Sequence, residues 1–205
     1  MAATSAPEGK PPRPRVPASE RRDALIEAAV HEFARGGFHG TPVDRIARRV
    51  GVAQPYVFSL FPNKRELFLA AVQRNHERIV EVFTRAAAEF DPETAIPGTD
   101  VLLAMGQAYG QLLRSDRDSL MLQHQAFAAC DDDIIRDQVR GGYAQLVTLV
   151  ERLSGADADR VDEFFRYGMW LNVGAAMDVE DLSASCEWIR AERDHEEQAP
   201  GAASA

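Results

Sequence analysis

The side chains best suited to specific recognition lie in one short stretch, residues 50–67, which reads VGVAQPYVFSLFPNKREL. Gln54, Tyr56 and Ser59 bring an amide, a phenol and a hydroxyl close together, and Lys64 follows with a positive charge. Such polar side chains hydrogen-bond to base edges and to phosphate oxygens, and a lysine attracts phosphates by its charge. The stretch therefore predicts recognition of DNA.

The other candidates for chemistry are weaker. The run DDDII at 131–135 imitates a carboxylate metal cluster, but acidic residues at a helix start, one of them a cap, explain it better. Cys130 and Cys186 lie far apart without a C-x-x-C motif, which predicts reduced thiols and no structural zinc site. No glycine-rich phosphate loop, G-x-S-x-G or H-E-x-x-H motif occurs. We expect no catalytic residue, no metal, no cofactor and no enzymatic activity.

The charge of the chain is unevenly distributed. The formal net charge is −9, yet residues 1–66 hold 11 Lys and Arg against 7 Asp and Glu. A basic N-terminal part can meet phosphates while an acidic body stays away from them, although the charge also serves solubility. No apolar run reaches the roughly 18 to 20 residues of a membrane span, and the N-terminus lacks the apolar region of a signal peptide. We expect a cytoplasmic protein.

Apolar spacing predicts helices almost throughout, hence an all-α fold of about nine helices. The first helix begins near residue 19 and stops at Gly36 or Gly37. In the second, Thr41 supplies a hydroxyl cap before Pro42 at the first helical position. The short third helix has Gln54 as an approximate cap before Pro55. The later helices are a long one from the cap Asn63 to about Glu89, then roughly 99–114, 116–129, 131–153, 157–177 and 181–194.

The first three of these helices have the spacing of a helix-turn-helix. In that geometry the third helix enters the major groove. We expect Val57, Leu60 and Phe61 to point inward, which leaves Gln54 and Tyr56 on another face of the helix. The alternative is a small three-helix unit without a nucleic-acid role. The coincidence of basic charge with this spacing favours DNA binding.

The run GGFHGTPVDRIARRVGVAQPYVFSLFPNKRELFLAAV resembles the DNA-binding region of the TetR family of bacterial transcriptional regulators. The positions that carry the resemblance are Thr41, Ile46, Ala47, Gly51, Val52, Phe58, Phe61, Lys64 and Leu67. It covers roughly residues 20–72; beyond them only length, helicity and helix order are similar. The resemblance implies a homodimeric repressor that leaves a palindromic operator in double-stranded DNA when a small molecule binds its C-terminal domain.

The resemblance also implies roles for single residues. Thr41 and Lys64 look like phosphate contacts, and Gln54, Tyr56 and Ser59 occupy positions that read bases and backbone. Arg45 and Pro55 complete the predicted DNA-contacting set. The chain departs from the family at Phe58, where many members have Tyr, and also at Leu60 and Ala53. We expect backbone contact to depend more on Tyr56, Lys64 and the basic arm.

The body should hold the small molecule. The predicted pocket residues are Phe68, Met105, Tyr109, Met121, His124, Gln125, Tyr143, Met169 and Trp170, with Leu113 and Phe127 as further candidates. The alternative for each apolar residue in this set is that it packs in the hydrophobic core and contacts no ligand. His124 and Gln125 could orient a ligand, although a buried histidine with satisfied hydrogen bonds explains the first as well. Gly141-Gly142 either thins a pocket wall or permits close packing or a kink.

The C-terminal helices are predicted to build a two-fold dimer. The run VDEFFRYGMWLNVGAAM alternates bulky and small side chains, which lets two helices approach closely. The predicted interface residues are Phe164, Phe165, Gly168, Ala175, Leu182 and Ile189. The alternative is that this face belongs to the core of one chain, since periodicity does not separate the two.

The chain is thus divided into four parts: a disordered basic arm at 1–18, a helix-turn-helix domain at 19–65, a helical effector-binding and dimerisation domain at 66–194, and a disordered tail at 195–205. Two function classes remain open. One is a ligand-responsive DNA-binding repressor. The other is a helical small-molecule-binding protein or enzyme whose DNA-binding domain is vestigial.

Overall fold

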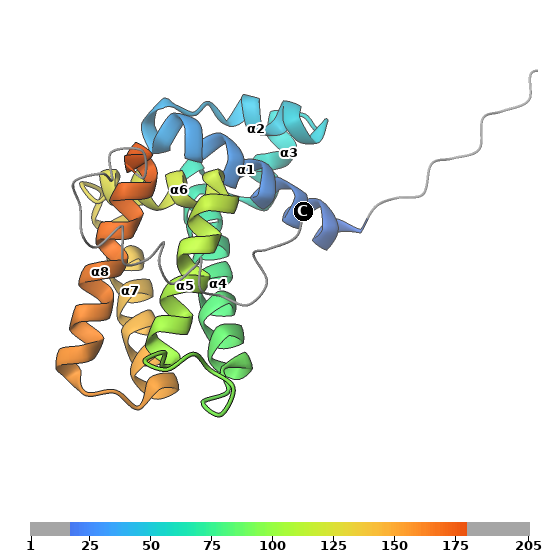
Figure 1. Cartoon of the computed structure of the whole chain (residues 1–205). Coiled ribbons are helices and arrows are strands. Elements are labelled where there is room, and N and C mark those ends of the chain that lie inside the picture. The colour runs from blue at the N-terminus through green and yellow to red at the C-terminus, as the bar shows by residue number, and fades with distance from the viewer. Residues whose placement is uncertain (1–16, 180–205) are drawn as a thin grey trace, which may run out of the picture.

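The computed structural model describes residues 17–179, which form eight helices and, within that range, no strand (Figure 1). The helices are α1 (Ala18–Gly40), α2 (Val43–Val50), α3 (Gln54–Leu60), α4 (Lys64–Glu89), α5 (Val101–Ser115), α6 (Arg117–Ala128), α7 (Asp133–Ser154) and α8 (Ala158–Met177). The all-α prediction is confirmed. The helix expected near 181–194, the tail and nearly all of the basic arm lie outside the described residues.

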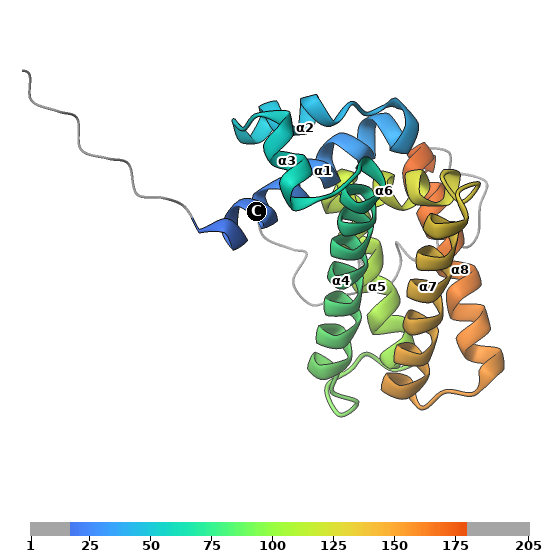
Figure 2. The same cartoon turned by 180° about the vertical axis from the view of Figure 1, so that it is seen from behind.

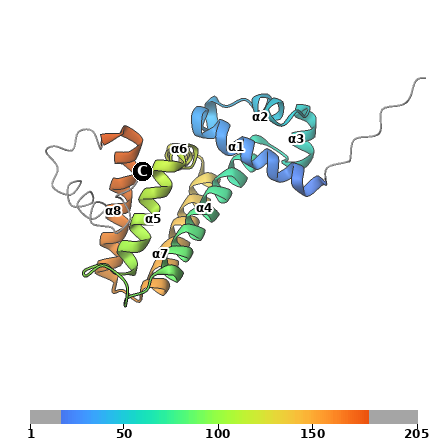
Figure 3. The same cartoon turned by 45° about the vertical axis from the view of Figure 1, so that its right-hand side comes forward.

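The molecule has two parts that meet along α1. Helices α1, α2 and α3 form one end, and α4 runs from that end down into the body beside α5 and α7 (Figure 2). Figure 3 shows α4, α5, α7 and α8 side by side, with the short α6 close to α1. Helix α6 packs against both α1 and α4. None of the helices in residues 17–179 is long and apolar enough to cross a membrane.

Aspartate and asparagine caps fix where the body helices begin. The Asn63 side chain accepts a hydrogen bond from the Glu66 N–H at the start of α4. Asp132 does the same for the N–H groups of Ile134 and Ile135 at the start of α7. Such caps satisfy N–H groups that have no partner within the helix. The prediction that the acidic run at 131–135 starts a helix is confirmed.

Two apolar clusters form the interior. The first joins the N-terminal helices to α4 and includes Phe33 and Phe68. The rings of these two residues pack edge to face, with 4.9 Å between ring centres. Leu122 and Ala126 of α6 belong to this same cluster. The second lies between α4, α5, α7 and α8, with Met105 fully buried. The core beneath the N-terminal helices therefore includes residues from the body.

Two predicted helix caps are wrong. Pro42, not Thr41, precedes α2, and no side chain caps that helix. Thr41 is fully buried, and its hydroxyl donates to the Glu32 carbonyl at 3.1 Å. Gln54 is the first residue of α3, so Ala53 occupies the cap position and contributes no side-chain bond.

Gly37 breaks the helical backbone of α1, as the sequence predicts, although the helix then continues to Gly40. Its φ of 66° lies in a region that residues with a Cβ rarely adopt. A Cβ at Gly37 would also lie 2.4 Å from Oε1 of Gln125 on α6. The glycine thus allows both the break in α1 and the close approach of α6.

We expect Gly37→Ala to lower the free energy of unfolding by about 1–3 kcal/mol, because it strains the backbone and displaces Gln125. Gly40→Ala is the matched control, since nothing lies within 4 Å of its Cβ position and its φ is not positive. That control should be neutral or stabilising by up to about 1 kcal/mol. Urea denaturation of both variants measures the difference; equal effects would contradict this account of Gly37.

Candidate DNA-contact surface and interior cavity

The turn between α2 and α3 sets the angle of the short third helix. Gly51 ends α2 in the left-handed conformation, with φ 74° and ψ 33°. The N–H groups of Gly51 and Val52 then bond to the Arg48 and Ala47 carbonyls. Val57 is fully buried and Phe61 nearly so, and these two side chains hold α3 against the core. One face of α3 is therefore fixed and the other is presented outward.

The outward face of α3 carries the residues predicted to read DNA. Gln54 and Tyr56 are half-buried, whereas Pro55 and Ser59 are exposed. The Ser59 hydroxyl donates to the Tyr56 carbonyl at 2.7 Å. The guanidinium of Arg21 lies 5.8 Å from the centre of the Tyr56 ring. These groups form one polar surface at the N-terminal end of α3.

Lys64 is held at the start of α4, next to the end of α1. Its ammonium donates to the His39 carbonyl at 3.1 Å and lies 5.5 Å from the centre of the Phe38 ring. Partial burial lowers the pKa of Lys64 from its ordinary value. These contacts place the ammonium beside the C-terminal end of α1.

A buried carboxylate positions the arginines of α2. Glu32 on α1 is only 6% exposed, and its oxygens lie 3.2 Å from Arg49 Nη1 and 3.8 Å from Arg45 Nε. Arg45 remains about half exposed, so it can still reach a phosphate. This role of Glu32 was missed at the sequence level because the partners belong to different helices.

Thr41 differs from what the resemblance implied. Its side chain has no exposed surface, and its hydroxyl is already engaged with the Glu32 carbonyl. The hydroxyl is therefore not placed to bind a phosphate, and we correct that expectation for the side chain.

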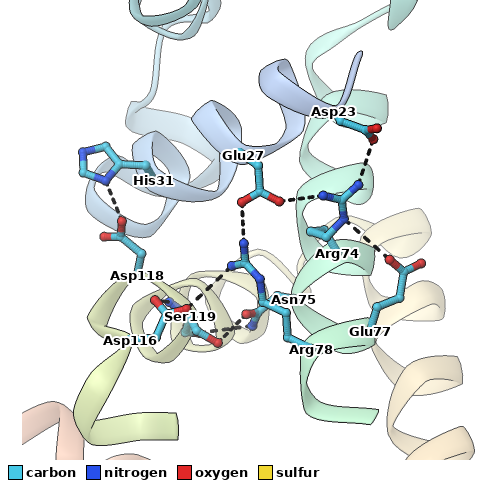
Figure 4. Close-up of polar contacts among 10 residues, drawn as sticks. All are labelled: Asp23, Glu27, His31, Arg74, Asn75, Glu77, Arg78, Asp116, Asp118 and Ser119. Carbon is cyan, nitrogen blue, oxygen red and sulfur yellow. Dashed lines mark hydrogen bonds and ion pairs between the residues drawn. The ribbon is translucent and has the colours of Figure 1, made fainter. Parts of the chain in front are cut away.

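A polar cluster ties α1 to the body (Figure 4). Arg74 on α4 pairs with Asp23 and Glu27 of α1 at 2.9 and 2.6 Å. Arg78, one turn further, pairs with Glu27 and lies 3.7 Å from Asp116, the cap of α6. Opposite charges thus connect three helices that are far apart in the sequence.

Two buried polar residues lie beside these ion pairs, near Arg78 and Asp116 (Figure 4). Asn75 on α4 is 3% exposed, and Ser119 on α6 has no exposed surface. The Asn75 amide donates to the Ser119 carbonyl at 3.1 Å, and the Ser119 hydroxyl donates back to the Asn75 Oδ1 (Figure 4). Such reciprocal bonding satisfies polar groups that would otherwise destabilise the interior.

The body contains a partly open cavity of about 120 Å³ between α4, α5, α6, α7 and α8. Of the predicted pocket residues, Tyr109, Tyr143 and Met169 line it, and so does Phe127. Sequence reasoning missed His76, Gln123 and Gln138, because polar residues inside helices give no signal that distinguishes a cavity wall from a solvated face. Gly142 also lines the cavity, where its missing side chain leaves room for His76.

The other predicted pocket residues lie elsewhere, and these predictions are corrected. Phe68 and Met121 pack into the cluster beneath the N-terminal helices, and Met105 fills the core of the body. His124 Nε2 lies 3.3 Å from the Asn172 carbonyl.

Two further residues of the predicted pocket are also outside it. Gln125 approaches Gly37 of α1. Trp170 is 44% exposed on α8. The helical spacing correctly predicted that these residues lie on helices. It did not predict whether a given helix face packs against another helix or borders the cavity.

The residues predicted to form the dimer interface lie in different places in the structure. Phe164, Phe165 and Gly168 line the cavity, which favours the alternative of a core within one chain, and their part in a dimer contact stays a prediction. Ala175 packs beside the core of the body. Leu182 and Ile189 lie outside the described residues. The exposed large apolar residues of α8 are instead Met169, Trp170, Val173 and Met177.

Comparisons with known proteins agree on one family. Residues 25–71 match the family model described as bacterial regulatory proteins, tetR family. Over 66 residues the chain is 41% identical to the HTH-type transcriptional activator FasR of Mycolicibacterium smegmatis, a match that covers 32% of this chain and 30% of that protein. The chain therefore spans about a third of this curated relative.

Solved structures show the same fold. A TetR-like transcriptional regulator from Rhodococcus sp. RHA1 superimposes with a TM-score of 0.60 at 24% identity, covering 79% of this chain and 85% of that one. A TetR-family member from Streptomyces coelicolor gives a TM-score of 0.66 at 21% identity, covering 86% and 97%. The likeness thus extends through the body.

We expect Asn75→Ala to lower the free energy of unfolding by about 1–3 kcal/mol, since it leaves the Ser119 hydroxyl buried without its acceptor. Ser119→Ala should cost a similar amount, and the double variant less than the sum. The exposed Ser115→Ala, whose hydroxyl bonds only within its own helix, is the control and should change stability by less than about 0.5 kcal/mol. A denaturant double-mutant cycle measures the coupling; additive effects would contradict a direct interaction.

Proposed function

We propose that this chain, which belongs to the TetR family of bacterial transcriptional regulators, represses transcription by binding an operator as a homodimer. In this proposal a small molecule in the cavity of the body releases the protein from DNA. The observation that carries the proposal is the outward face of α3, where Gln54, Tyr56 and Ser59 stand clear of a buried opposite face. The function requires no enzymatic activity, and its place is the cytoplasm, where the chromosome lies.

The proposed contacts follow from this geometry. Gln54, Pro55, Tyr56 and Ser59 enter the major groove with α3, where the amide and the phenol reach base edges. Lys64 binds a phosphate, and Arg45 assists it from α2. Residues 19–65 form the DNA-binding domain and residues 66–194 the regulatory one, with the basic arm adding charge along the phosphates.

A dimer follows from the small size of the reading surface. One helix such as α3 covers only a few base pairs, whereas two of them set about 34–36 Å apart read a palindromic site. The surface we propose for the two-fold contact is the exposed apolar part of α8, formed by Met169, Val173 and Met177. These residues recur at helical spacing on one stripe, and burying them in a dimer is favourable.

The second candidate function is a small-molecule-binding protein in which the N-terminal helices no longer act on DNA. The cavity supports ligand binding in either case. A gel shift on the DNA that flanks the gene of this protein distinguishes the two. The repressor proposal expects a specific complex that weakens steeply with salt. No complex at low salt would favour the second candidate.

Lys64→Ala is expected to weaken binding to all DNA sequences. Loss of one phosphate contact per protomer should reduce the slope of log affinity against log salt by about 1 for each protomer bound. Arg152→Ala is the control, because it removes a positive charge from an exposed site on α7, far from α3. Fluorescence anisotropy across a salt series measures both slopes. An unchanged slope for Lys64→Ala would remove this lysine from the phosphate contacts.

Val173→Glu is expected to dissociate the dimer, because it places a charge in the proposed apolar contact. Ile96→Glu is matched to it, since both side chains are 37% exposed but Ile96 lies in the loop between α4 and α5. Light scattering should report a monomer for the first variant and a dimer for the second. If Val173→Glu remained dimeric and bound operator normally, the contact would have to lie on another surface.

A further inference from the structure

The cavity lining carries no full charge. Within residues 17–179, none of the residues that border the cavity is Asp, Glu, Lys or Arg. His76 borders it as well, and burial lowers the pKa of this imidazole, which favours its neutral form. Burying an unpaired charge in such a place costs far more than a small ligand can recover elsewhere.

Most of the polar groups in the lining already bond to the protein. Asn75 uses both ends of its amide on Ser119. The Gln138 amide donates to the Leu69 carbonyl at 2.9 Å, and the Gln73 amide donates to Glu77 at 3.2 Å. A ligand would therefore find few partners for polar groups of its own.

The polar side of α5 is engaged in the same way. The Tyr109 hydroxyl donates to Gln123 Oε1 at 2.8 Å and accepts from the amide of Asn172 at 2.9 Å. Asn172 is 1% exposed and Tyr109 8%, so the bond between these two side chains is closed off from solvent. It positions the Tyr109 ring as part of the cavity wall.

A row of aromatic rings forms part of the remaining, apolar wall. Tyr109 and Phe83 lie 5.8 Å apart between ring centres, Phe83 and Phe164 5.6 Å, Phe164 and Phe165 5.4 Å, and Phe165 and Tyr143 5.2 Å. All five residues border the cavity. Ring faces and edges of this kind pack well against another planar, apolar group.

The size of the cavity limits its occupant. Its volume of about 120 Å³ is close to that of apolar cavities of roughly 150 Å³ that bind benzene in other proteins. We infer that the cavity binds an uncharged, mainly apolar molecule about the size of one aromatic ring, and that this class of molecule is the effector. The inference rests on the proposed function only for the consequence of binding, because binding itself needs no DNA.

Toluene, benzoate and benzylamine form a matched set of neutral, anionic and cationic probes on one ring. Calorimetry on the full chain should detect toluene binding and weaker or no binding of the two ions at pH 7. At ten times its dissociation constant, toluene should raise Tm by about 3–6 °C, because it binds the native state alone. Equal or tighter binding of benzoate or benzylamine would overturn the inference, and so would failure of toluene to bind.

Gly168→Leu tests whether toluene occupies this cavity. Gly168 lines the cavity, and a Cβ there meets no atom within 4 Å, so a larger side chain has room to fill the space. Gly141→Leu is the matched control on α7, where a Cβ is equally unobstructed but the site is outside the cavity lining. Toluene binding should fall at least tenfold in Gly168→Leu and persist in Gly141→Leu.

Leu146→Trp fills the same cavity from α7 and replaces Gly168→Leu if that variant does not fold. Wild-type affinity for toluene in a folded cavity-filling variant would place the binding site elsewhere and overturn the inference. Anisotropy on DNA in the absence of probe separates the two proposals. Intact DNA binding without toluene binding would contradict this inference and leave the proposed function standing. Toluene binding without DNA binding would contradict the proposed repressor function and leave this inference standing.

Discussion

The packing of α6 between the N-terminal helices and the cavity is the contact on which the rest of the structure depends. Leu122 and Ala126 belong to the apolar cluster beneath α1 and also border the cavity. The N-terminal helices therefore share their core with residues of the body. A change in the position of α6 alters the packing beneath α1 at the same time, because close-packed interiors transmit small displacements.

Polar groups make this junction specific. The apolar cluster alone would tolerate sliding of α1 over α6, since dispersion and burial depend little on direction. The pairs of Arg74 with Asp23 and Glu27 and the buried Asn75–Ser119 bonds have fixed partners and geometry. Gly37 adds a steric condition, because only a residue without a Cβ permits the approach of Gln125. Together they define one register between the two ends of the molecule.

Features of the fold that depend on residues close together in the sequence were predictable, whereas those that depend on contacts between different helices were mostly not. Local signals predicted much of the helical structure: the Asn63 cap, an acidic cap within the run at 131–135 and a break at Gly36 or Gly37 all follow from neighbouring residues. The Thr41 cap failed because Pro42 takes the cap position of α2, and the Thr41 side chain is instead buried against α1, where its hydroxyl donates to a carbonyl nine residues away. The outward residues of α3 were identifiable because a family pattern marks them.

The cavity was predictable only in part, for the same reason. Tyr109, Tyr143 and Met169 were identified, while His124, Gln125 and Met121 lie on other faces of α6. An amphipathic pattern shows that a face is buried but not whether a neighbour fills the space beside it. Phe164 and Phe165 illustrate this, since their spacing suits a dimer contact and a cavity wall equally well.

Within residues 17–179 the cavity lining has no Asp, Glu, Lys or Arg, a property it shares with the hydrocarbon core of a lipid bilayer. A lining of this kind and the hydrocarbon core of a lipid bilayer reject the same molecules, because both penalise an unpaired charge. A compound that enters the cavity is therefore one that also dissolves in lipid and crosses a membrane without a transporter. Under the proposed function, such a compound would reach the cavity by diffusion from outside the cell as well as from inside it.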